Sequence, residues 1–117
     1  MANAQITVLT STSTVGSNLS VLLADITDLI LLTTDVKQKK NLQIQQRQLA
    51  AELQVLIDKE VSKVLPEYVE AQSKLEKAVI AAKGVKEGLS NIANAIIKIA
   101  TAITKVAALA AKVALLG

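Results

Sequence analysis

The side chains that most often carry out chemistry in proteins are missing from this sequence. It contains no histidine and no cysteine, so it lacks the usual general base near neutral pH, the commonest metal ligand and every thiol. Only carboxylates, lysines and hydroxyls remain for a reaction. We therefore expect no catalytic residue, no metal site and no cofactor, and we predict that the protein is not an enzyme.

The charged residues do not form a reactive cluster either. The carboxylates in the middle of the chain alternate with bases: Glu52, Asp58, Glu60, Glu67, Glu70, Glu76 and Glu87. The main basic cluster has no aromatic residue between its members: Lys37, Lys39, Lys40 and Arg47. A solvated helix face explains both sets, and we do not expect nucleic acid as a partner.

The apolar composition favours thin helical layers. Hydrophobic residues make up 51% of the chain, yet Tyr68 is its only aromatic residue. Compact cores usually use aromatic side chains to fill space, whereas helix pairs can pack with aliphatic side chains and alanine. From Ile57 to Val113, apolar residues recur at alternating intervals of three and four, which keeps one seam of a helix facing a partner helix. We predict an all-α, coiled-coil-like protein with Tyr68 as a packing residue.

The first 17 residues are rich in serine and threonine, so we predict an extended N-terminal arm over residues 1–17 that packs on neighbours. Ser17 and Asn18 offer N-cap oxygens for a helix that begins there. A polar patch from Lys37 to Asn41 is either a break between two helices or an exposed turn of one long helix. We favour one continuous helix, because the patch contains no glycine or proline.

Pro66 is the sole proline. It disfavours helical geometry at Leu65 and suits the first position of a new helix. We predict a long antiparallel helical hairpin over residues 18–117, with its turn near Pro66 and a kink at Gly84 and Gly88. A kinked but continuous helix is the alternative at Pro66.

Charges provide a register for this hairpin. The charged side chains in residues 1–36 are all acidic, and those in residues 88–117 are all basic. Folding the chain at Pro66 places Asp28 opposite Lys105 and Asp35 opposite Lys98. Surface ion pairs contribute about 0 to 1 kcal/mol each, so these register charges would select the alignment more than they would stabilise it.

Two helices of about 50 residues, each about 70–75 Å long, cannot cover the apolar seam and its flanking alanines. We therefore expect a self-assembling structural protein, the building block of a filament, tube or large homo-oligomer, whose main partner is itself. The predicted assembly interface consists of Leu19, Leu22, Ile26, Leu29, Leu89, Ile92, Ile96, Ile99, Ile103, Val106 and Val113.

A lipid membrane is the alternative partner. The run from Ile92 to Leu116 is long enough to cross a bilayer, although it carries Lys98, Lys105 and Lys112. A pore-forming subunit or amphipathic anchor would place these lysines at the lipid interface. We expect no cleavable signal peptide, because the N-terminus lacks basic residues. The sequence does not indicate a compartment.

A few positions resemble the small structural proteins of refractile R-bodies, which polymerise into coiled ribbons in bacterial cytoplasm. The similar positions are Asn3, Gln5, Ile6, Thr7, Val15, Gly16, Gln45 and Gln46, fewer than a tenth of the chain. Val8 stands where that family typically has aspartate, and its Ala-Pro segment is absent. The resemblance implies a polymerising protein, but we do not assign the chain to that family.

Overall fold

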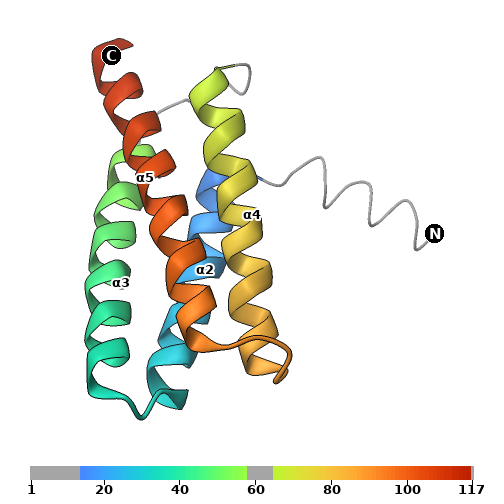
Figure 1. Ribbon diagram of the computed structural model, residues 1–117. Coiled ribbons are helices and arrows are strands. Elements are labelled where there is room, and N and C mark those ends of the chain that lie inside the picture. Colours follow the sequence, from blue (N-terminus) through green and yellow to red (C-terminus); the bar gives the residue numbers. More distant parts are fainter. Residues whose placement is uncertain (1–13, 58–64, 117) are drawn as a thin grey trace, which may run out of the picture.

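The computed structural model describes residues 14–57 and 65–116, which form four helices (Figure 1). These are α2 (Val15–Leu32), α3 (Val36–Ile57), α4 (Pro66–Lys86) and α5 (Ile92–Leu116). The described residues contain no strand, so the predicted all-α class is confirmed. The proposed arm lies largely outside the described residues, and its last part is helical because α2 begins at Val15, with the Thr14 hydroxyl accepting a hydrogen bond from the Ser17 amide at 3.0 Å.

The helices form a four-membered bundle. α2 packs against α3 and α4, and α5 packs against the same two helices. Consequently α2 and α5 occupy opposite corners of the bundle. α2 and α4 run in one direction, whereas α3 and α5 run in the other (Figure 1).

This arrangement contradicts the predicted long hairpin. Its helices would be about 70–75 Å long, but the longest principal extent of the molecule is 41 Å. The first helix ends at Leu32, and residues 33–35, which follow it, are not helical. Asp35 then caps α3, its Oδ1 accepting a hydrogen bond from the Gln38 amide at 2.9 Å. An aspartate three residues before a free amide is a common start signal for a helix.

The expected kink at the two glycines is a complete helix end. Gly88 has φ of +77°, a conformation that glycine adopts more easily than other residues. The Gly84 carbonyl accepts hydrogen bonds from the Leu89 amide at 2.7 Å and the Ser90 amide at 3.2 Å, which closes the end of α4. Asn91 then caps α5, its Oδ1 accepting from the Asn94 amide at 2.7 Å.

α4 begins at Pro66, as predicted, with Leu65 in an extended conformation. The connection from α3 lies outside the described residues.

Tyr68 is a packing residue, 7% exposed, and its hydroxyl accepts a hydrogen bond from the Val15 amide at 3.2 Å. Elsewhere in the core, α4 and α5 contribute many buried alanines, which allow close helix packing: Ala71, Ala78, Ala82, Ala95 and Ala102.

Candidate interaction surfaces

Most of the predicted assembly interface is buried within the single chain. Seven of its eleven residues belong to the core: Leu19, Leu22, Ile26, Leu29, Ile99, Val106 and Val113. Ile92, Ile96 and Ile103 are partly buried against that core. Only Leu89 is largely exposed, at 80%. The expectation that a second molecule must cover this seam is wrong. The turns at residues 33–35 and 87–91 divide the two predicted helices into four, and each helix has two neighbours from its own chain.

A different, outward face of α5 remains uncovered. It repeats at intervals of three and four and contains no charge: Ala93, Ile97, Ala100, Thr104, Ala107, Ala111 and Leu115. Each of these residues is exposed. Ala93, Ala100 and Ala107 were expected to flank the seam and to widen the apolar face, whereas the bundle turns them towards solvent.

The outward face of α2 comprises Ser17, Ser20, Val21, Ala24, Thr27, Asp28 and Leu31, and its one charged residue, Asp28, pairs with Lys86 of α4. α2 and α5 are each long and apolar enough to cross a membrane by length and composition. Only 33% of the α2 segment and 28% of the α5 segment are buried in the bundle. A core helix of a small soluble bundle buries its apolar stripe, but these two helices also carry uncharged residues on the opposite side.

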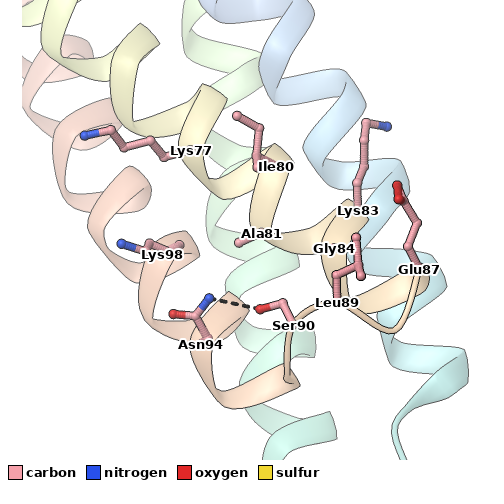
Figure 2. A pocket seen from close by; sticks show the side chains of 10 residues that line it. All are labelled: Lys77, Ile80, Ala81, Lys83, Gly84, Glu87, Leu89, Ser90, Asn94 and Lys98. Atoms are coloured by element: carbon pink, nitrogen blue, oxygen red, sulfur yellow. Dashed lines mark hydrogen bonds between the residues drawn. The ribbon is translucent and has the colours of Figure 1, made fainter.

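A groove of about 610 Å³ lies between α4 and α5 near the turn that connects them. Figure 2 shows its lining residues: Lys77, Ile80, Ala81, Lys83, Gly84, Glu87, Leu89, Ser90, Asn94 and Lys98. Ile80 is 71% exposed. Three lysines and one carboxylate make the groove basic, and its apolar residues would suit an apolar group that carries negative charge.

The turn between α2 and α3 forms a second exposed apolar surface. Leu31 and Val36 are 78% and 79% exposed, and Leu32 lies between them along the chain. Asp35 lies within this segment, and Lys37, Lys39 and Lys40 follow it; all four side chains are exposed. The turn lies at the same end of the bundle as the groove (Figure 1). We refer to the α4–α5 cavity as the basic groove.

A buried carboxylate joins α2 to α4. Asp25 is 4% exposed, and its Oδ1 accepts a hydrogen bond from Lys86 Nζ at 2.8 Å. Lys86 also donates to Asp28 Oδ2 at 2.9 Å, and Lys83 Nζ lies 3.5 Å from Asp25 Oδ2. The hydrogen bonds to Asp25 and Asp28 raise the pKa of Lys86 above its ordinary value. This cluster holds the register of two parallel helices.

The predicted register pairs are not formed within the chain. Asp28 pairs with Lys86, and Lys105 Nζ lies 3.0 Å from Glu70 Oε2. The hydrogen bond from Lys105 and its positive charge lower the pKa of Glu70. Asp35 caps α3, and Lys98 lines the basic groove. The pairs fail because α2 and α5 lie at opposite corners, whereas the hairpin prediction placed them side by side.

Sequence reasoning missed the Asp25 cluster, although a signal for it exists. Asp25 and Asp28 are three residues apart, and so are Lys83 and Lys86. Because α2 and α4 run parallel, the equal spacing lets Lys83 and Lys86 meet Asp25 and Asp28. The remaining carboxylates do not converge, and the described residues contain no group of three acidic side chains that could hold a metal ion.

Comparisons with known proteins do not assign this chain to a family. No protein-family model matches it, and the searches of curated proteins and of solved structures give no significant match.

Proposed function

We propose that this protein is a self-assembling structural protein that builds a filament, tube or other large homo-oligomer. The observation that supports this proposal is the pair of exposed outward faces on α2 and α5 at opposite corners of the bundle, of which the α5 face has no charge and the α2 face has only Asp28. When α2 of one copy packs on α5 of another, the first copy keeps a free α5 face and the second keeps a free α2 face. Such a head-to-tail contact continues as a filament unless its rotation closes a ring.

The charges on α5 oppose contact between two like α5 faces. α5 contains three lysines and no acid, so a symmetric α5–α5 contact would bring lysines together and is opposed by repulsion. The two acids of α2, Asp25 and Asp28, are already paired with Lys83 and Lys86 of the same chain. Repulsion between like charges selects against one orientation of partners more than it adds affinity to another.

Sedimentation velocity and negative-stain microscopy of the purified full chain test the proposal directly. We expect polymers or large oligomers without lipid, and more of them at higher protein concentration. Ala100→Glu would place a carboxylate on the outward face of α5 and is expected to block assembly. Ala51→Glu, at an exposed position of α3, is the matched control. Monomers of 12.3 kDa at every concentration would contradict the proposal.

Membrane binding is the second candidate, and the composition of α2 and α5 supports it. An uncharged α5 face beside Lys98, Lys105 and Lys112 could lie at an anionic lipid surface. The protein would then float with anionic vesicles and release an entrapped dye. Lipid-free polymers with no vesicle binding would reject this candidate and favour the structural one.

A further inference from the structure

Both turns at one end of the bundle expose large apolar side chains. Leu31 and Val36, on either side of the α2–α3 turn, are 78% and 79% exposed, and Leu32 is 58% exposed. Leu89, in the α4–α5 turn, is 80% exposed. The two turns lie at the same end of the bundle (Figure 1). Apolar side chains that gather on an exposed surface mark a contact with another protein or with a membrane.

The same end carries the excess of positive charge. Lys37, Lys39 and Lys40 follow the α2–α3 turn directly and are exposed. The half of the bundle that contains both turns, residues 24–46 and 77–104, has seven lysines and four acids. The other described residues contain four bases and four acids. Within the described part of the chain, the excess of positive charge is therefore confined to the half with the two turns.

The acids of this half leave most of its lysines without a partner. The two acids of α2 already bind Lys83 and Lys86. The other two acids are Glu87 and Asp35, and Asp35 caps α3. Within the described ranges, 14–57 and 65–116, the five remaining lysines of this half form no ion pair: Lys37, Lys39, Lys40, Lys77 and Lys98. A negatively charged partner would therefore meet unpaired lysines beside exposed apolar side chains.

We infer that this end of the bundle docks on a membrane that contains anionic lipid. The docking tip consists of the exposed apolar residues of both turns and the lysines nearest to them: Leu31, Leu32, Val36, Leu89, Lys37, Lys39, Lys40 and Lys98. Its apolar side chains would enter the boundary between headgroups and acyl chains, while its lysines bind the lipid phosphates. The inference rests on membrane binding, the second candidate function, and names the surface that touches the lipid.

An anionic bilayer fits the docking tip better than nucleic acid does. Nucleic acid phosphates would meet the lysines but would leave Leu31, Val36 and Leu89 in water. The docking tip also has no aromatic side chain on which a base could stack. A bilayer offers negative charge at its surface and an apolar interior just below it, so it accommodates both kinds of side chain.

Docking through the tip holds the bundle upright. Because both turns lie at one end of the helices, the helix axes would point away from the bilayer (Figure 1). A bundle bound through the outward face of α5 would instead lie flat. Upright docking leaves the outward faces of α2 and α5 at the sides, where neighbouring docked copies can reach them.

Vesicle flotation tests the contribution of the lysines. The wild type should float with vesicles of equimolar phosphatidylcholine and phosphatidylglycerol but not with pure phosphatidylcholine, and salt should release it. Lys39→Gln with Lys40→Gln should lower the partition coefficient by about tenfold or more. Lys74→Gln with Lys112→Gln removes the same net charge from the other half of the bundle and should bind like the wild type.

A second pair of variants tests the apolar side chains. Leu31→Gln with Leu89→Gln should also lower the partition coefficient by about tenfold or more. The control is Val69→Gln with Leu115→Gln, at positions of the other half that are 58% and 84% exposed, and it should bind like the wild type. All four apolar positions are exposed, so no substitution removes a core contact. Circular dichroism checks that every variant keeps its helices.

A fluorescent label locates the surface that enters the lipid. The chain has no cysteine, so Leu32→Cys and Ala107→Cys each provide one site for an environment-sensitive dye. Ala107 belongs to the outward face of α5. With anionic vesicles, the label at position 32 should brighten and shift its emission to the blue, whereas the label at position 107 should not change.

The outcomes separate the inference from membrane binding itself. If the wild type floats and the tip variants float equally well, or if only the label at position 107 responds, another surface binds lipid and the inference fails. If the lysine variant is impaired but the leucine variant is not, the end is a general polyanion site and the inference also fails. If the wild type binds neither kind of vesicle, the inference and the membrane candidate fail together, while lipid-free self-assembly is judged by its own test.

Discussion

Lys86 Nζ lies 2.8 Å from Oδ1 of Asp25, a carboxylate that is 4% exposed in the core between α2 and α4. Lys86 also binds Asp28 on the next turn of α2. The cluster links two parallel helices that are not consecutive in sequence, so it bears directly on how the chain arranges its four helices.

Lys86→Met should lower the free energy of unfolding, because it leaves the buried Asp25 carboxylate with only the longer contact to Lys83. Adding Asp25→Asn should recover part of the loss, since the charge that lacks its main partner is then removed. Urea denaturation measures both effects. Lys77→Met, which alters an exposed lysine of the same helix, is the control and should change stability little. Equal effects at the two lysines would contradict the role of the cluster.

The same ion pair predicts a dependence on alkaline pH. The pKa of Lys86 is raised by its hydrogen bonds to Asp25 and Asp28. Its contribution to stability is therefore fully present below the ordinary lysine value of 10.5 and is lost as the pH rises through the higher folded-state pKa. Urea midpoints measured from pH 8 upwards should fall less steeply above that value for Lys86→Met than for the wild type. Parallel curves for the two proteins would argue against this contribution.

Leu22→Ala tests whether the apolar seam is an internal core. Leu22 is fully buried in the single chain, so we expect a loss of about 2–5 kcal/mol in the free energy of unfolding. The neighbouring Val21, 39% exposed, provides the control Val21→Ala, with a much smaller expected loss. If Leu22 instead belonged mainly to a contact between copies, the loss would vanish on dilution to monomers.

Gly88 and Gly16 have different backbone conformations, so alanine substitutions at the two positions can be compared. Gly88 has φ of +77°, so Gly88→Ala should cost about 1 kcal/mol or more through backbone strain. Gly16 is helical, and a Cβ there would meet its nearest neighbouring atom only at 3.9 Å. Gly16→Ala should therefore be neutral or stabilising by up to about 1 kcal/mol. Thermal unfolding of both variants measures the contrast, and a stabilising Gly88→Ala would contradict the described turn.

Much of the local structure follows from the sequence. The apolar spacing identifies which side of each helix is buried, and the fixed backbone geometry of proline explains why α4 begins at Pro66. The scarcity of aromatic residues correctly indicates helices packed by aliphatic side chains and alanine. Turn residues are weaker signals, and the cap at Asp35 was overlooked because the surrounding residues are good helix formers.

Periodicity shows that a helix face needs a partner but does not say which helix provides it. A seam such as Leu19 to Leu29 looks the same whether a second molecule or a later part of the same chain covers it. The tertiary structure decides between these, because the turns at Asp35 and Gly88 bring four helices of one chain together and bury that seam internally. It also decides the charge pairs, since Asp28 can reach Lys86 on the adjacent helix but not Lys105 on the helix at the opposite corner.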